Sequence, residues 1–262
     1  MDWMKFRPIY FAISGVALAF SVYAIVMWQF KLSIDFSGGT VVEYKFPDGN
    51  IKIEKYGSDF TESKAREYSQ SLPEKPEIIR FETVGPTFSQ EILKKTYIAL
   101  GIAAGWILVW VAWQFKSLQF GISAVLATLH DTVIILGTFA ALGHFIGVEV
   151  DILFVTAALT VLAFSVHDTI VVYDRIRETM KKHGGSSMKE IANRALSETI
   201  VRSLNNSLTI IFMLVALFLM GGQTIKWFVA ALLVGTISGT YSSPFVAVPL
   251  LVTWEELKKK LK

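Results

Sequence analysis

The chain has 262 residues, of which 53% are hydrophobic and 18% charged, a composition too apolar for an ordinary soluble domain. It contains no cysteine, which excludes disulfides, thiolate metal sites and thiol catalysis. The formal net charge of +3 is explained by basic residues near membrane ends and gives no support for nucleic-acid binding. These properties predict a polytopic membrane protein.

Apolar windows recur along the chain, and each approaches the ~20 residues needed to cross ~30 Å of hydrocarbon. They predict spans at about residues 9–30, 97–113, 120–143, 150–173, 204–220 and 227–252. The first follows Lys5 and Arg7 as a signal peptide would, but it is too long and lacks a small-residue cleavage site, so we expect a retained helix. The fold class predicted is a membrane all-α, six-helix bundle with a small α+β extracytoplasmic domain.

The lysines and arginines of the short loops predict that both termini face the cytoplasm. With the N-terminus inside, the basic residues between 174 and 202 also fall inside. The loop at 144–149 has no lysine or arginine, and the loop at 221–226 has only Lys226. We therefore expect a multi-pass protein of the cytoplasmic (inner) membrane.

The extramembrane segment shows strand-like alternation at 40–46 and 51–54 around a turn at 47–50, then a helix-like stretch at 59–72 and a strand at 77–84. So small a domain is expected to lean on a partner or on the membrane. The predicted organisation is a first transmembrane helix with a cytoplasmic N-terminus at 1–30, an extracytoplasmic α+β domain at 31–95, transmembrane helices 2 and 3 at 96–143, helices 4 to 6 at 144–253 with a cytoplasmic loop at 174–203, and a basic cytoplasmic tail at 254–262.

The cytoplasmic loop is expected to contain a turn at His183–Ser187 and then an amphipathic basic helix, either a solvated connector or a lipid or partner site. The run 238–244 predicts a kink or hinge in the last span. Small-residue spacings at Gly101–Gly105 and Gly235–Gly239 predict close helix packing.

Titratable side chains occur at membrane depth in neighbouring spans. His130 and Asp131 lie in the third span, and His167 and Asp168 lie in the fourth. A carboxylate at a helix centre costs ~2.5–3.5 kcal/mol, so such residues are functional candidates. The fifth span carries a supporting polar stripe along one helical face: Glu198, Arg202, Asn205, Asn206 and Thr209.

We expect Asp168 to pair with Arg202, and Asp131 to pair with a group on another helix or subunit. An aspartate that exchanges between an arginine and a proton can relay protons, and a neighbouring histidine adds a second titratable group. The proton-relay candidates are Asp168, Arg202, His167, Asp131 and His130. In the alternative, Asp168 and Arg202 form a fixed ion pair with the histidines bridging helices, or Arg202 extends to the membrane interface.

No enzyme, cofactor or metal site is predicted. Gly38 and Gly39 lack the following Lys-Ser/Thr and helix of a nucleotide loop, and hydrolase signatures are absent from the sequence. An energy source must then come from an ion gradient or a partner.

Several of these motifs resemble the SecF branch of the SecD/SecF family of translocase subunits. Ile34–Thr40 resembles the signature of that family, and Asp168–Glu178 resembles its fourth-span motif. Val84–Pro86, His130-Asp131 and Ser238–Ser243 also fit. The signature residues are Asp35, Phe36, Gly38, Gly39 and Thr40.

The resemblance implies six membrane helices with one external domain, paired pseudosymmetrically with SecD in a resistance-nodulation-division-like core. It implies association with the SecYEG channel and use of the proton-motive force to draw secreted proteins across the membrane. The partners implied are SecD, SecYEG, the translocating polypeptide and membrane lipids, with no nucleic acid. In the family, the residues at the positions of Asp168 and Arg202 are linked to proton transport.

One residue departs from the family pattern: His167 stands where the family usually has Asn. His167 either tunes the protonation of Asp168 or only replaces the Asn geometrically. Two other functions stay open at this stage, namely a stand-alone proton-coupled half-transporter and a non-conducting assembly scaffold for the channel.

Overall fold

The computed structural model describes residues 1–183 and 185–260. They form two compact units, one made of Met1–Phe30, Leu100–Val148 and Leu153–Lys262, the other of Lys31–Ala99 and Glu149–Ile152. Within the described residues, six helices are long and apolar enough to cross a membrane. The predicted six-helix membrane fold with a small α+β domain is therefore confirmed.

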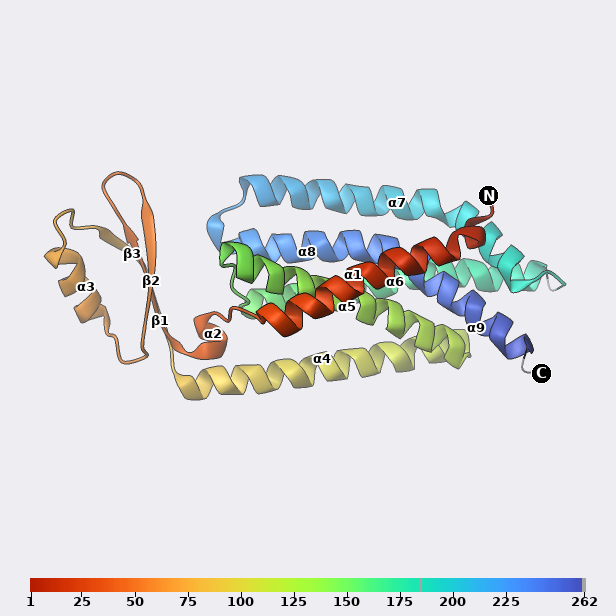
Figure 1. Ribbon diagram of the computed structural model, residues 1–262, viewed down its shortest axis with the longest axis horizontal. Coiled ribbons are helices and arrows are strands. Elements are labelled where there is room, and N and C mark those ends of the chain that lie inside the picture. Colours follow the sequence, from red (N-terminus) through yellow and green to blue (C-terminus); the bar gives the residue numbers. More distant parts are fainter. Residues whose placement is uncertain (184, 261–262) are drawn as a thin grey trace. The chain divides into compact units, whose positions relative to one another are not determined.

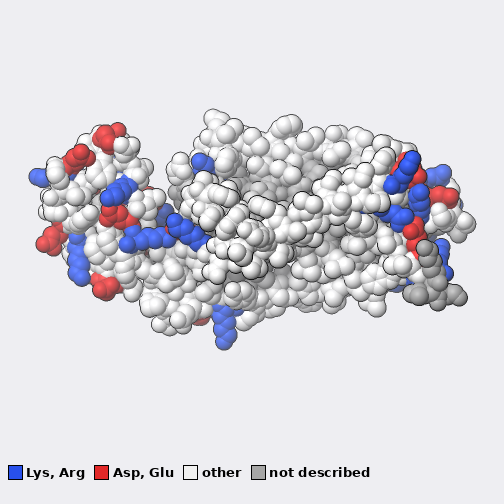
Figure 2. Space-filling view, viewed as in Figure 1, with Lys and Arg blue, Asp and Glu red and all other residues white. Residues whose placement is uncertain are grey.

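The first unit is a helical bundle whose two chain ends lie at the same end (Figure 1). On the face shown in Figure 2, charged side chains gather at that end of the bundle and its middle is uncharged. The elements are η1 (a 3₁₀ turn, Trp3–Phe6), α1 (Arg7–Trp28), α4 (Pro86–Phe115), α5 (Leu118–Ile146), α6 (Ile152–Lys182), α7 (Met188–Met220), α8 (Gln223–Ser242), η2 (Ser243–Ala247) and α9 (Val248–Lys260).

Most of the expected loop at 174–203 is helical. Helix α6 continues to Lys182, where Glu178 and Lys182 form an i,i+4 ion pair at 2.7 Å. Helix α7 begins at Met188, because Ser187 and Glu190 form a reciprocal capping box. Gly184 of the expected turn and the last two residues of the expected basic tail lie outside the described residues.

The predicted interruption of the last span is confirmed. A π-helical turn, η2, separates α8 from α9 and contains Pro244. Proline has no N–H to donate into the helical ladder and crowds the preceding turn, so the register of the helix changes there. Ser242 and Ser243 at this break are fully buried.

Small residues determine where the helices approach most closely. A Cβ atom on Gly137 of α5 would lie 2.3 Å from the Cα of Ser21 on α1, and one on Gly235 of α8 would lie 2.3 Å from a methyl of Val161 on α6. Packing at the 235–239 spacing is therefore as expected. The other pair, Gly101 and Gly105, faces open space among the described residues, so the packing expected there is not found.

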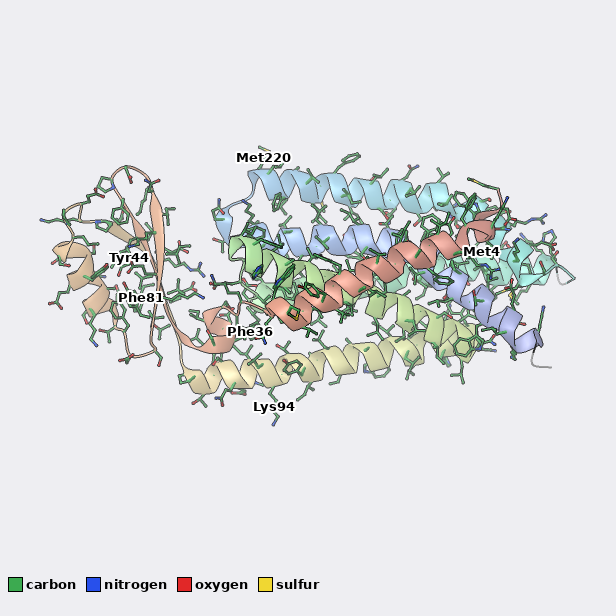
Figure 3. All side chains as sticks on the ribbon, viewed as in Figure 1. Met4, Phe36, Tyr44, Phe81, Lys94 and Met220 are labelled. Carbon is green, nitrogen blue, oxygen red and sulfur yellow. The ribbon has the colours of Figure 1, made fainter. Side chains whose placement is uncertain are left out.

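The second unit is a three-stranded antiparallel sheet with a helix on it. Its elements are α2 (Ile34–Ser37), β1 (Gly39–Lys45), β2 (Ile51–Tyr56), α3 (Glu62–Ser71) and β3 (Glu77–Val84), with strand order β2-β1-β3. Val42, Tyr44 and Ala65 form its core, and Phe81 packs against them (Figure 3). A core of this size gives the domain little stability of its own.

Close packing at Gly235 yields a stability prediction. Gly235→Ala should lower the thermal unfolding midpoint of the purified protein in detergent, because overpacking a close helix contact costs about 1–3 kcal/mol. Gly105→Ala is the matched control and should not lower the midpoint, since its Cβ meets nothing within 4 Å and alanine is the better helix former. Equal midpoints for the two variants would contradict the packing described here.

Candidate functional site

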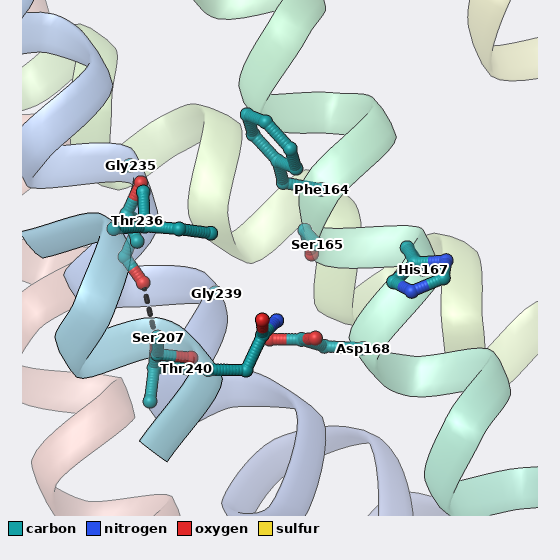
Figure 4. A pocket seen from close by; sticks show the side chains of 11 residues that line it. Phe164, Ser165, His167, Asp168, Ser207, Gly235, Thr236, Gly239 and Thr240 are labelled. Carbon is teal, nitrogen blue, oxygen red and sulfur yellow. Dashed lines mark hydrogen bonds between the residues drawn. The ribbon is translucent and has the colours of Figure 1, made fainter. Parts of the chain in front are cut away.

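A cavity of about 230 Å³ lies between α6, α7 and α8. Asp168 is its carboxylate, half-buried at the midpoint of α6. Figure 4 shows the Asp168 side chain pointing from α6 toward the residues of α7 and α8, whereas the His167 ring lies apart from it. Residues from three helices therefore surround one carboxylate at membrane depth.

The cavity wall opposite Asp168 is polar. Helix α7 contributes Asn206 and the buried Ser207, and α8 contributes Thr236 and Thr240. The two threonine hydroxyls donate to backbone carbonyls one turn earlier, at 2.8 Å to Leu232 and 2.7 Å to Thr236. Their proton is thus committed to the helix, and each oxygen presents lone pairs as an acceptor. The wall thus offers acceptor oxygens from the two threonines and donors from Asn206 and Ser207, so it can solvate Asp168 in either protonation state.

Asp168 has no cationic partner among the described residues. No lysine or arginine lines the cavity, and no ion pair to Asp168 occurs in the described part of the chain. His167, its neighbour in sequence, is exposed on the bundle surface and borders both this cavity and a second hollow against α4. Asp168 is therefore the acidic group among the residues that line the cavity, and His167 is the other titratable residue at its border.

The expected ion pair between Asp168 and Arg202 is not present among the described residues. Arg202 lies on α7 one turn before Asn206, with an exposed side chain. Asn206 and Ser207 occupy the level of α7 that meets Asp168. The expectation failed because helical spacing shows which face Arg202 shares with Asn206, but not which turn of α7 lies opposite Asp168.

Asp131, in contrast, is enclosed by hydroxyl donors. It is 1% exposed on α5 and accepts hydrogen bonds at 2.6 Å each from Ser165 of α6 and from Ser238 and Ser242 of α8. The expectation that Asp131 finds partners on other helices is confirmed. Hydrogen bonds to the ionised form stabilise it, so this donor set compensates a buried negative charge.

His130 completes this group of residues. Its Nδ1 lies 3.1 Å from Oδ1 of Asp131, while its buried Nε2 has no hydrogen-bond partner among the described residues. With Nδ1–H donating to the aspartate, Nε2 carries the free lone pair. Ser165 joins the two sites, because it donates to Asp131 and also lines the Asp168 cavity.

The remaining polar residues of the stripe on α7 lie elsewhere. Glu198 forms an ion pair with Arg175 of α6, and Asn205 and Thr209 are exposed. Of that stripe, Asn206 alone lines the Asp168 cavity, and Ser207 beside it was not predicted. Ser238 and Ser242 were visible only as part of a serine-rich run, with no signal that they converge on Asp131.

The signature residues lie in the extramembrane unit. Phe36 is buried, and Thr40 shares a hydroxyl contact of 2.9 Å with Thr83 across the sheet. Gly39 has φ +120°, and a Cβ there would lie 2.8 Å from the carbonyl oxygen of Tyr56, so only glycine fits. Gly38 has φ +72°. The Asp35 carboxylate accepts the backbone N–H of Ile152 at 3.1 Å.

Comparison with known proteins shows which protein family this chain resembles. The profile of the family described as "Protein export membrane protein SecD/SecF, C-terminal" matches residues 64–257. The protein translocase subunit SecF of Thermobaculum terrenum is 37% identical over 97% of this chain and 94% of its own length. The protein translocase subunit SecF of Anaerolinea thermophila is 31% identical over 95% of this chain and 92% of its own length.

The fold agrees. The crystal structure of SecDF, a translocon-associated membrane protein, from Thermus thermophilus superposes with a TM-score of 0.88 at 27% identity, covering 98% of this chain. The chain spans 39% of the length of that SecDF chain. A SecDF structure in a super-membrane-facing form gives a TM-score of 0.80. The protein is thus a polytopic membrane protein of the protein-export class. It belongs to the SecD/SecF family.

The serine donors around Asp131 can be tested one at a time. Ser242→Ala should lower the thermal unfolding midpoint, because a hydrogen bond to a charged group contributes about 1.5–3 kcal/mol. Thr138→Ala, also on a buried helix, removes a hydroxyl bonded only to its own helix and should change the midpoint far less. Equal losses in the two variants would refute a special role for the donors around Asp131.

Proposed function

We propose that this protein is the SecF-type subunit that, together with SecD, uses the proton-motive force to promote protein translocation through the SecYEG channel. The observation that carries the proposal is Asp168, a carboxyl group at the middle of a membrane helix that borders a hydroxyl-lined cavity and has no cationic partner among the described residues.

A proton is the simplest neutralising partner for that carboxyl group. An unpaired charge at membrane depth is costly, so a carboxyl group there is stable when protonated or when paired with a cation. Arg202, one turn from the cavity on α7, is a cation that a change in helix packing can bring to Asp168. Exchange between these two partners takes up a proton in one state and releases it in the other.

The Asp131 group supports this division of roles. Three serine donors hold the Asp131 carboxyl group in place, and these bonds join α5 to α6 and α8. His130, whose Nε2 has a free lone pair, is the member of that group able to accept a further proton. Both residues stay relay candidates, secondary to Asp168.

The partners follow from the relatives. Proteins named protein translocase subunit SecF match nearly the whole chain, and the similar solved structures are SecDF chains of which this chain covers 39%. A separate SecD protein would supply the other part of that assembly. The cytoplasmic membrane, with both termini inside, is the location that the distribution of lysine and arginine favours.

Replacing Asp168 tests the proposal directly. Asp168→Asn should abolish proton flux through the protein, because the amide cannot take up a proton. Secretion should then no longer depend on the proton-motive force. Asp174→Asn, six residues later on α6 with an exposed side chain, should behave as wild type. Secretion and proton flux would be measured in inverted or reconstituted vesicles containing the full complex.

Other outcomes of that experiment would indicate one of the two alternative functions, an assembly scaffold or a stand-alone half-transporter. Unchanged secretion in Asp168→Asn, with SecYEG still co-purifying, indicates an assembly scaffold. Proton flux that depends on Asp168 without SecD or SecYEG in the membrane indicates a stand-alone half-transporter.

His167 calls for a separate measurement. Its exposed ring is sequence-adjacent to Asp168 but points elsewhere, so His167→Asn should preserve the rate of proton flux and its profile against pH (Figure 4). A profile displaced along the pH axis would show instead that the imidazole tunes Asp168. His183→Asn, on the exposed cytoplasmic turn, controls for general effects of removing a histidine.

A further inference from the structure

Asp35 is the one charged residue of the family signature, and the proposed proton chemistry does not use it. The residues around it hold it firmly. Ile34 and Phe36 on either side are buried, the Ser33 side chain accepts its backbone N–H at 3.2 Å, and the Gly38-Gly39 pair turns the chain directly into β1. Its side chain is therefore directed by a rigid local structure rather than by a flexible loop.

That side chain accepts the backbone N–H of Ile152 at 3.1 Å. Ile152 is the first residue of α6, and the N–H groups of the first turn of a helix take their acceptors from outside the helical ladder. A carboxylate at this position satisfies such a donor and interacts favourably with the helix dipole. Asp35 thus caps α6 from a segment more than a hundred residues away in the sequence.

Further bonds surround the cap. Residues 31–33 and 150 pair as a parallel bridge, with hydrogen bonds of 2.8 Å from Val150 N to Lys31 O and 3.0 Å from Ser33 N to Val150 O. Lys55 of β2 forms an ion pair with Glu149 at 2.6 Å. Together these contacts fasten the segment that enters α6 to the extramembrane sheet. We call residues 31–35, Lys55 and 149–152 the α6 clamp.

Helix α6 then runs without interruption from Ile152 to Lys182. Asp168 lies on it about 24 Å further along the axis, at 1.5 Å per residue. An uninterrupted helix is stiff, so a translation along its axis or a rotation about it at Asp168 also displaces its first turn. The first turn is the part that Asp35 holds.

We propose that Asp35 is a positioning residue that couples α6 to the extramembrane domain, so that movement of the Asp168 helix reaches the domain through the α6 clamp. The coupling rests on the proposed proton-driven function. The clamp itself is a property of the extramembrane unit and is tested independently of proton flux.

The clamp is tested first by amide hydrogen exchange of a peptide that covers residues 149–156, measured in the full complex. Asp35→Ala should raise the exchange rate about fivefold, the effect of losing a helix cap. Asp35→Asn keeps an oxygen that can accept the Ile152 N–H and should exchange nearly as wild type. Asp48→Ala removes an aspartate bonded within the β1–β2 turn and serves as the matched control.

The coupling is tested by measuring proton flux and secretion in the same vesicles. Asp35→Ala should keep proton flux within about twofold of wild type while secretion falls to the level without a proton-motive force, since only the connection is lost. A merely structural role would lower both activities together with the amount of assembled complex. Asp35→Asn should restore secretion.

A covalent replacement of the clamp gives the sharpest result. The chain has no cysteine, so Lys55→Cys and Glu149→Cys introduce two unique thiols at a contact that is 2.6 Å in the ion pair. Joining them with a short thiol-reactive cross-linker in the Asp35→Ala background should restore secretion. The same variant without cross-linker should stay uncoupled.

Three results would overturn the proposal: wild-type secretion in Asp35→Ala, parallel loss of flux and secretion at reduced complex levels, or no recovery on cross-linking. Failure of the proton-driven function is distinguishable, because it appears in Asp168→Asn as unchanged flux and secretion. In that case unchanged exchange of 149–156 in Asp35→Ala would refute the clamp, and raised exchange would support it as a structural contact but overturn the coupling.

Discussion

The requirement that every polar group in a hydrocarbon environment finds a partner shapes this bundle more than any other constraint. Asp131 is the clearest example, because its carboxyl group accepts hydrogen bonds from Ser165, Ser238 and Ser242 on two other helices. Since a buried carboxylate left without donors is strongly destabilising, these bonds determine the rotation and depth of α6 and α8 relative to α5. Glycine at 239, where a Cβ would lie 3.4 Å from Ser165, keeps that approach open.

The same constraint separates the two aspartates by role. Asp131 is 1% exposed and accepts hydrogen bonds from three serine hydroxyls, so gaining a proton would disturb bonds that join three helices. Asp168 borders a cavity lined by hydroxyl and amide groups and has no lysine or arginine partner among the described residues, so fewer contacts depend on its protonation state. Exchange of protons fits the second environment, and fixed structure fits the first. Ser165 contributes to both environments, because its hydroxyl donates to Asp131 and its side chain lines the Asp168 cavity.

The sequence was sufficient for what depends on local pattern. Apolar length predicted the spans, and strand alternation predicted β1 and β3, because these signals come from neighbouring residues. It was insufficient where distant segments meet. Arg202 shares a face with Asn206, yet the turn of α7 that meets Asp168 depends on packing against α8, which no spacing encodes. The convergence of Ser238 and Ser242 on Asp131, and of Asp35 on Ile152, likewise exists only after folding.

The extramembrane unit combines a small apolar core with several polar contacts at its edge. Its core contains few fully buried side chains, so much of its rigidity must come from its ends and from the segment 149–152 that it binds. The contacts of Asp35, Val150 and Glu149 supply part of that rigidity, because each joins residues 149–152 to another segment of this same unit. A domain with a small apolar core is thus held together by polar contacts at the segment from which the chain enters α6.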